Sequence, residues 1–294
     1  MKFAPIALVA LLAGLAAPAG AAPKPAKPPK AVDYPAADWR TPDPENVVVF
    51  DTSQGRIIAE LAPWAAPGHV ERVRGLVRRG FYDGLTFFRV IDEFMAQTGD
   101  PRNDGTGGDE SQADLTAEFF FRRGRDLPLT SMGKLGPDMK IQSTTEVGFV
   151  GGFAVRGTPD MQMMVAADGK VSGWPLFCAG ALGMARATDP NSANSQFYFM
   201  RQTYPSLDAN YTVFGRVLSG LEAVRKIKVG EPVAAPRDAM TRVRMLADIP
   251  VAERPAVQVL NTASPSFKTI VAAAVASGKG PADACAIDIP VKIG

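Results

Sequence analysis

Short runs of β-prone residues recur through the middle of the chain, and turn-forming residues separate them. Residues 47–50 and 57–61 flank the sequence Thr-Ser-Gln-Gly, which predicts a hairpin. Further β-prone runs occupy residues 86–91, 196–200 and 211–217. Strands are therefore expected to dominate the fold.

Two segments have the apolar spacing of helices instead. The first begins near Pro67, carries valines on one face and ends before Gly80. The second has Leu221, Val224 and Ile227 at intervals of three. Because these helices bracket the strands in sequence, we expect an antiparallel barrel, closed or nearly closed, with helices packed on it.

The two ends of the chain differ from its middle. A basic start, an apolar run and small residues up to Ala21 are typical of a secretory signal peptide over residues 1–21, although an uncleaved membrane anchor is the alternative. The sequence PKPAKPPK indicates an extended tether over residues 22–45. We therefore expect a soluble mature protein that is periplasmic or secreted. In the extension at residues 250–294, a further helix is predicted over residues 267–276, with Ser266 as its N-cap.

Composition excludes several kinds of chemistry. Lys and Arg number 32 against 30 Asp and Glu, so no strong field favours nucleic acid or a membrane surface. His69 is the one histidine, which argues against a His-based zinc site, and its place in the first turn of a helix predicts a surface position. Cys178 and Cys285 are the only cysteines, and whether they pair as a disulfide is left open.

Three segments stand out for their combination of residues. They are FYDGLTFFRVIDEFMAQTGDPRNDGTGG at 81–108, GALGMARATDPNSANSQFYFM at 180–200 and LDANYTVFGRV at 207–217. Taken singly, their arginines and aromatic residues could belong to an ordinary surface and core. In this order, they resemble the cyclophilin family of peptidyl-prolyl cis/trans isomerases, from about residue 47 to about residue 227 apart from 121–177.

The resemblance implies a mainly β fold, a closed eight-stranded antiparallel barrel capped by two α-helices. It implies that Arg89 is catalytic and that proline-containing polypeptides are the substrates, with no metal and no cofactor. The residues that it implies for the apolar pocket are Phe94, Met95, Tyr198, Leu207 and Tyr211. The residues that it implies for gripping the substrate backbone are Gln97, Gly105, Ala185, Arg186, Ala187 and Gln196.

The sequence departs from the family pattern at several positions. Phe88 stands where many members have histidine, Ser206 where many eukaryotic members have tryptophan, and Tyr211 where those have histidine. The loss of the tryptophan puts tight cyclosporin binding in doubt, though not isomerisation, and Phe88 does not count against activity. The stretch 121–177 is much longer than the usual link, and it is either a lid on the pocket or a solvated decoration.

The sequence therefore predicts an isomerase domain over residues 46–249, with an insert at about 121–177. Its predicted function is to rotate X-Pro peptide bonds and so to accelerate the folding of exported proteins, as a monomer. A non-catalytic module that binds prolyl peptides and an envelope-assembly scaffold are the alternatives. An arginine beside the pocket, at position 89, favours catalysis over both.

Overall fold

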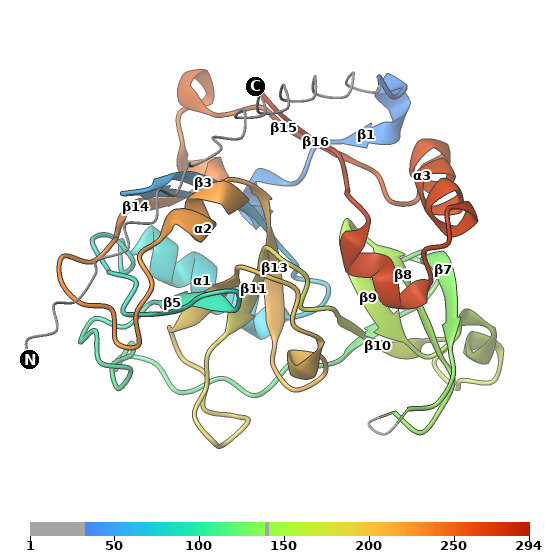
Figure 1. Ribbon diagram of the computed structural model, residues 1–294, viewed down its shortest axis with the longest axis horizontal. Helices are drawn as coiled ribbons and strands as arrows, with labels where there is room; N and C mark the ends of the chain where they lie inside the picture. The colour runs from blue at the N-terminus through green and yellow to red at the C-terminus, as the bar shows by residue number, and fades with distance from the viewer. Residues whose placement is uncertain (1–32, 139–140) are drawn as a thin grey trace, which may run out of the picture. The chain divides into compact units, whose positions relative to one another are not determined.

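An antiparallel sheet of eight strands forms the framework of the molecule (Figure 1). The computed structural model describes residues 33–138 and 141–294. The strands of this sheet, in spatial order, are β14 (Met240–Met245), β2 (Val47–Thr52), β3 (Gly55–Leu61), β13 (Val213–Ser219), β11 (Ala181–Met184), β12 (Phe197–Met200), β5 (Met95–Thr98) and β4 (Arg89–Ile91). The mainly β fold is confirmed, and so is the hairpin predicted at its start, which is β2 and β3.

The sheet curls but stays open, so the prediction of a closed barrel is wrong. Its two outer strands, β4 and β14, do not pair with each other; among the described residues, isolated bridges between Thr86 and Ala239 and between Val90 and Gly230 lie across this gap. The segment between α2 and β14 contains Pro232 and Pro236, which have no backbone N–H to donate to a ladder. A continuous ladder therefore does not form across this seam.

Two helices pack on the core of the curled sheet. Helix α1 (Pro67–Arg78) and helix α2 (Leu221–Lys226) both contribute to the largest cluster of buried apolar side chains, which also contains residues of β2, β3 and β12. Pro67 occupies the first turn of α1, and Gly80, beyond the helix, adopts a φ of 67°, as the sequence predicts. The prediction that His69 lies on the surface is wrong, because its side chain is fully buried.

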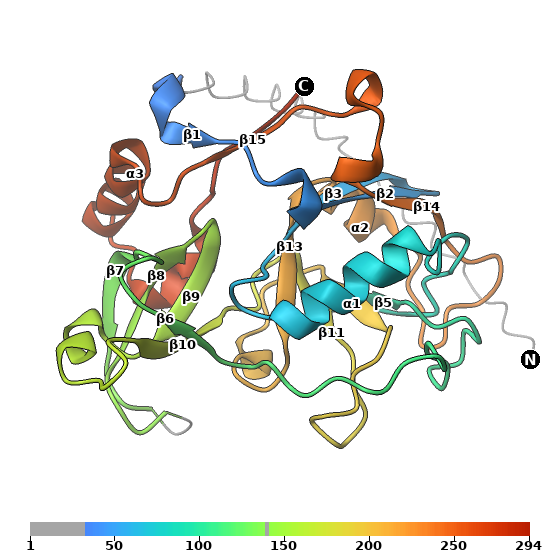
Figure 2. The same cartoon turned by 180° about the vertical axis from the view of Figure 1, so that it is seen from behind.

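Residues 121–177 form a second sheet (Figures 1 and 2). Its strands, in spatial order, are β6 (Phe121–Arg123), β10 (Val171–Pro175), β9 (Phe153–Gly157), β8 (Thr145–Val150) and β7 (Thr130–Leu135). This insert is thus a folded layer that shares an apolar cluster with the segment between β3 and α1, where Trp64 packs edge-on against Phe121 and Phe153.

The C-terminal extension folds against the insert sheet. Helix α3 (Pro265–Ala276), beside β7 in Figure 2, and the 3₁₀ turn η7 (Pro281–Ala286) contact it. Phe267 of α3 packs edge-on against Phe149 of the sheet. The N-cap of α3 is Ser264, whose hydroxyl accepts a hydrogen bond from the Phe267 amide at 3.2 Å. The prediction of Ser266 as the cap is therefore wrong; Ser266 bonds to Asp38 instead.

A third, small sheet and a disulfide complete the described fold. The strands of the third sheet, in order, are β1 (Trp39–Arg40), β15 (Val257–Leu260) and β16 (Val291–Ile293). Cys178 and Cys285 form a disulfide with their Cα atoms 5.0 Å apart, so the pairing that the sequence left open is present. It ties η7 to the segment that leads into β11.

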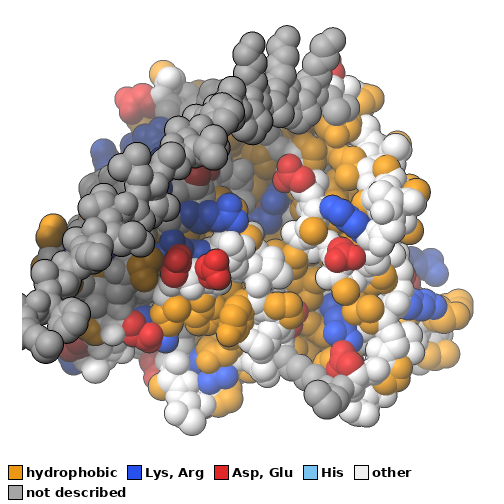
Figure 3. Space-filling model, viewed as in Figure 1, with side chains coloured by type: hydrophobic (Ala, Val, Ile, Leu, Met, Phe, Trp, Pro, Cys, Tyr) orange, Lys and Arg blue, Asp and Glu red, His pale blue; other side chains and the backbone are white. Residues whose placement is uncertain are grey.

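The predicted signal peptide and most of the predicted tether, residues 1–32, lie outside the described residues. Within the part that the structure describes, no helix is both long and apolar enough to cross a membrane. Acidic and basic side chains are interspersed with apolar ones on the face shown in Figure 3. This mixture agrees with the balanced charge of the sequence.

Candidate active site

A cavity of about 540 Å³ opens beside the outer strands of the eight-stranded sheet. Strands β4, β5 and β12 supply part of its wall, and loops supply the rest. The residues that line it are Phe88, Arg89, Phe94, Met95, Gln97, Asp104, Gly105, Ala185, Arg186, Tyr198, Leu207, Tyr211, Glu231 and Pro232. The site therefore combines one apolar wall with a small number of polar and charged groups, as ligand pockets commonly do.

The apolar wall is held by aromatic packing. Tyr198 and Met95 belong to one buried cluster, in which Phe177 stacks on the Tyr198 ring with 6.1 Å between centroids. Phe94 packs against Tyr204 at a centroid distance of 4.4 Å. Burial raises the pKa of the Tyr198 hydroxyl well above its ordinary value, so this group stays neutral. The wall can hold an apolar ring without offering it a charge.

A chain of polar side chains runs from Arg89 into the loop at residues 104–108. Arg89 Nη1 donates to Gln97 Oε1 at 3.2 Å, and Gln97 Nε2 donates to Gln196 Oε1 at 2.9 Å. Gln196 Nε2 in turn donates to the carbonyl oxygens of Gly105 and Gly107, at 3.0 and 2.7 Å. Each glutamine amide accepts through its oxygen and donates through its nitrogen, so the hydrogen bonds along this chain fix which way both amides point. The acceptor oxygen of Gln97 therefore faces the guanidinium of Arg89.

The two arginines of the cavity have different surroundings. Arg186 lies over the Tyr211 ring, 4.3 Å from its centroid, and donates to the carbonyl oxygens of Ala187 and Asn210 at 2.9 and 3.1 Å. Its guanidinium therefore braces loops. Among residues 33–138 and 141–294, Arg89 donates to two side chains, so it retains N–H groups that none of these residues engages.

All the site residues suggested by the resemblance line this cavity except Ala187 and Gln196. Those two line an adjacent cavity of about 580 Å³, which shares Gln97, Gly105, Ala185 and Arg186 with the first. The structure thus brings the whole set together on one surface. Whether each residue contributes to catalysis stays a prediction.

The cavity also contains residues that sequence reasoning did not include in the site. Phe88 and Asp104 lie in the first motif segment, so their nearness to Arg89 and Gly105 was a usable signal. Glu231 and Pro232 come from the loop after α2, 142 residues from Arg89 in the case of Glu231. No motif in the sequence connects that loop to the pocket.

The buried carboxylate of Asp100 organises the loop that carries Gly105. Its Oδ2 accepts from the amides of Gly105 and Asp104 at 2.6 and 3.1 Å, and its Oδ1 accepts from the amide of Arg102 at 2.7 Å. A Cβ at Gly107 would lie 1.9 Å from Oδ1 of this carboxylate, so only glycine fits there. The role of Asp100 is therefore to fold the loop.

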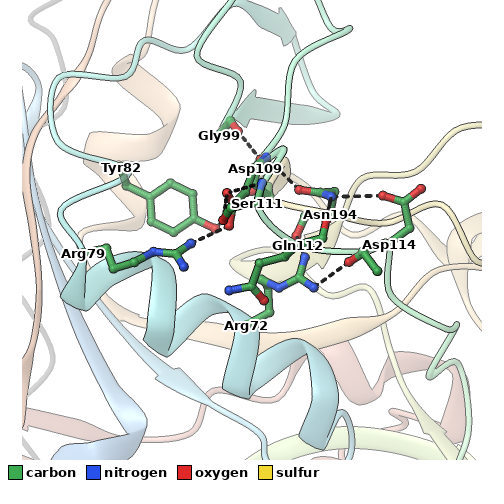
Figure 4. A network of polar contacts seen from close by, with 11 residues as sticks. Arg72, Arg79, Tyr82, Gly99, Asp109, Ser111, Gln112, Asp114 and Asn194 are labelled. Atoms are coloured by element: carbon green, nitrogen blue, oxygen red, sulfur yellow. Dashed lines mark hydrogen bonds and ion pairs between the residues drawn. The ribbon is translucent and has the colours of Figure 1, made fainter.

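Helix α1 anchors the continuation of this loop (Figure 4). Arg79 forms an ion pair with Asp109, whose amide donates to Asn194 Oδ1 at 2.8 Å. Arg72 donates to the carbonyl oxygens of Ala113 and Asn194, at 2.6 and 3.3 Å. One helix thus holds both the 104–114 loop and the loop before β12, which are two walls of the adjacent cavity.

Glu118 provides a second anchor, at the start of α1. Its carboxylate accepts from the amides of Gly68 and His69 at 3.0 Å each, and His69 Nδ1 lies 2.6 Å from Oε2. Burial alone would raise the pKa of Glu118, but these hydrogen bonds outweigh burial and hold it below its ordinary value. The buried histidine therefore has a structural role: with Glu118 it forms a contact that fixes the start of α1.

Replacing Glu118 with glutamine should lower the free energy of unfolding by about 2 kcal/mol at pH 7, because charge-assisted hydrogen bonds are lost. Since the folded-state pKa of Glu118 is depressed, its contribution is complete above the unfolded-state pKa of about 4.3 and is lost as pH falls through the lower folded-state pKa. The free energies of unfolding in urea of the parent and of Glu118→Gln should therefore differ at pH 7 and become equal in acid. Glu253→Gln, at an exposed position, is the control. If the two free energies of unfolding differed by the same amount at pH 7 and at pH 3, the stabilising role of the Glu118 carboxylate would be refuted.

No described residue of the insert lines the first cavity, so the lid interpretation of residues 121–177 is not supported. Phe177, at the end of the insert, supports the pocket indirectly, by stacking on Tyr198.

Across residues 33–138 and 141–294, no group of three or more His, Cys, Asp or Glu side chains is arranged to hold a metal ion.

The curled antiparallel sheet carries an apolar pocket beside a guanidinium, an arrangement with room for an apolar ring and N–H donors next to it. The family of cyclophilin-type peptidyl-prolyl cis-trans isomerases matches residues 47–248, and the chain belongs to this family. It is accordingly a peptidyl-prolyl cis/trans isomerase.

Individual relatives agree with this assignment. A probable peptidyl-prolyl cis-trans isomerase of Brucella suis is 35% identical over 190 residues, which cover 64% of this chain and 74% of that protein. A putative one of Staphylococcus epidermidis is 31% identical over 202 residues, which cover 67% of this chain and 90% of that protein.

Among solved structures, the cyclophilin AquaCyp293 from Hirschia baltica superposes with a TM-score of 0.76 at 33% identity. The match covers 89% of this chain and 98% of that one. The match therefore extends beyond residues 47–248, into the extensions at the ends of the chain.

Proposed function

We propose that Arg89 is the catalytic residue of this isomerase and that the apolar wall of the cavity holds the proline ring of the substrate. One observation carries the proposal: Arg89 lies beside the apolar wall with N–H groups that no described residue engages. Arg186, the other arginine in the lining, donates to backbone carbonyl oxygens and packs on Tyr211.

The chemistry of the reaction suits this arrangement. Rotation about a peptide bond costs ~18–20 kcal/mol, because the nitrogen lone pair is delocalised into the carbonyl group. Before proline the two isomers are close in energy, yet they exchange in tens to hundreds of seconds. A donor aimed at the prolyl nitrogen localises that lone pair, and a guanidinium can act in this way because it stays charged and presents fixed N–H groups.

The apolar wall provides the second requirement. If the proline ring is held by Phe94, Met95, Tyr198 and Leu207, the carbonyl side of the bond can turn while the ring stays in place. An acceleration of about 10⁵-fold requires about 7 kcal/mol of stronger binding in the transition state than in the ground state. No bond is made or broken, so no nucleophile and no proton acceptor takes part.

The mechanism predicts that kcat/KM changes little between pH 6 and pH 9. The reaction transfers no proton, and the neutral Tyr198 hydroxyl titrates above this range, because burial raises its pKa. A protease-coupled assay on a short X-Pro peptide, corrected for the protease's own profile, measures this dependence. A bell-shaped profile with a pKa near neutrality would show that a proton transfer limits the reaction and would overturn the mechanism.

We also propose that the protein acts on exported chains, in the periplasm or outside the cell. The pattern of residues 1–21 supports export, and so does the Cys178–Cys285 disulfide, because such bonds persist in oxidising compartments. The intact mass of the protein recovered from its native compartment tests this proposal: cleavage after Ala21 removes residues 1–21. The monomeric state stays a prediction.

A further inference from the structure

The loop between α2 and β14 brings an acidic side chain to Arg89. Glu231 Oε1 accepts a hydrogen bond from Arg89 Nε at 2.5 Å, and the two groups form an ion pair. Gln97 holds the same guanidinium through Nη1, at 3.2 Å. Two acceptors from distant parts of the chain therefore hold neighbouring nitrogens of one guanidinium.

Backbone hydrogen bonds fix the loop on either side of this contact. The amide and carbonyl of Gly230 bond to the carbonyl and amide of Val90, at 2.8 Å in both directions. The Val233 amide donates to the carbonyl of Phe88, also at 2.8 Å. These bonds flank Glu231 on one segment and Arg89 on the other, so the backbone sets the relative position of the two side chains.

The close turn of this loop requires glycine at position 230. A Cβ there would lie 2.7 Å from Val233 Cα and 2.9 Å from the Pro232 carbonyl oxygen. Pro232 itself lines the cavity beside Glu231. The sequence Gly-Glu-Pro thus forms a turn with little freedom, and it presents the carboxylate at the edge of the pocket.

Stability does not account for the ion pair. The side chains of Arg89 and Glu231 are 37% and 54% exposed, and pairs of that exposure typically contribute about 0–1 kcal/mol. An arginine side chain, however, has about 2 kcal/mol of rotamer entropy to lose when it is held in one conformation. Two acceptors at neighbouring nitrogens restrict the rotation of the guanidinium before a substrate arrives.

We propose that Glu231 is a positioning residue for Arg89: its carboxylate holds Nε so that the unengaged N–H groups stay directed to the peptide. This inference rests on the proposed role of Arg89 in catalysis. With Gln97 as its only partner, the guanidinium would be held at one nitrogen and could turn about its last side-chain bonds. Removing the carboxylate should therefore slow the turnover of bound peptide without weakening its binding.

The test compares Glu231→Ala and Glu231→Gln with the parent and with Glu222→Gln, an exposed acidic position on α2 that lies outside the cavity lining. Glu231→Ala should lower kcat about tenfold, as a small misplacement of a catalytic group can, and leave KM within about twofold. Glu231→Gln keeps an acceptor oxygen and should lose less. The thermal midpoint should stay at the parental value in both variants, and Glu222→Gln should match the parent in kcat and KM.

Two further readouts separate positioning from other roles. In nitrogen–proton NMR spectra, the Arg89 Nε–H signal should be protected from exchange in the parent and exchange faster in Glu231→Ala. In an Arg89→Ala background, Glu231→Ala should cost no further activity, because its effect passes through the arginine. A parental kcat in Glu231→Ala would overturn the inference. So would a fall in kcat that also occurs in the Arg89→Ala background, or one that comes with a lowered thermal midpoint. Parental activity in Arg89→Ala would instead refute the proposed role of Arg89.

Discussion

Replacing Arg89 with alanine should lower kcat/KM for an X-Pro peptide by about 10²- to 10³-fold, the usual cost of losing one preorganised donor to a transition state. The fold should survive, because the Arg89 side chain is partly exposed and lies outside the apolar core. A protease-coupled assay measures the rate, and the thermal midpoint reports the fold. Arg122→Ala, at an exposed arginine of the insert that pairs with Asp168, is the matched control and should retain parental activity.

Arg89→Lys should recover little of the lost activity. An ammonium keeps the charge but lacks the planar arrangement of N–H groups, so it cannot be held by Gln97 and Glu231 while also donating to the peptide in the same geometry. Full activity in Arg89→Lys would show that charge alone is sufficient. Parental activity in Arg89→Ala would show that another group of the pocket performs the reaction.

Loss of the disulfide should have the largest effect on stability. Cys178 and Cys285 are 107 residues apart in sequence, and closing a loop of that length stabilises a protein by ~4–5 kcal/mol in the chain-entropy treatment. The Cys178→Ser, Cys285→Ser double variant should therefore unfold at a much lower denaturant concentration than the oxidised parent. The parent under reducing conditions should shift in the same direction.

Alkylation followed by intact-mass measurement provides the control for this prediction. The oxidised parent should take up no alkylating reagent under denaturing conditions and two equivalents after reduction, because the described chain contains no free cysteine. Neither cysteine lines the catalytic cavity, so the double variant should still isomerise a short peptide below its unfolding temperature. An unchanged denaturation midpoint in the double variant would contradict the role assigned to the disulfide.

Local patterns predicted the elements whose residues determine their own conformation. The hairpin of β2 and β3 has a turn sequence between two β-prone runs, and α1 has a proline at its start and a glycine beyond its end. The site residues came from the resemblance of long motifs to a family, and the structure gathers them around two adjoining cavities. The predictions of the hairpin and of α1 succeeded because each depends on residues close together in sequence. The role of each site residue stays a prediction.

The features that were missed depend on contacts between distant residues. The seam between β4 and β14 stays open because a proline-containing loop lies there, and the insert sheet consists of short strands whose pairing has no clear periodicity. His69 is buried because Glu118, 49 residues away, reaches the start of its helix. Glu231 likewise meets Arg89 only through the pairing of its loop with β4.

Exchange spectroscopy on an Ala-Pro peptide is the sharpest test of catalysis by Arg89, because it detects the cis–trans exchange of the bound bond without a coupling protease. With the parent protein, we expect exchange far faster than the uncatalysed tens to hundreds of seconds, together with shifted signals from Phe94, Met95 and Tyr198. With Arg89→Ala, we expect those signals still to shift while exchange slows. Binding at the pocket without any acceleration in the parent would overturn the proposed catalysis and would leave a module that only binds prolyl peptides.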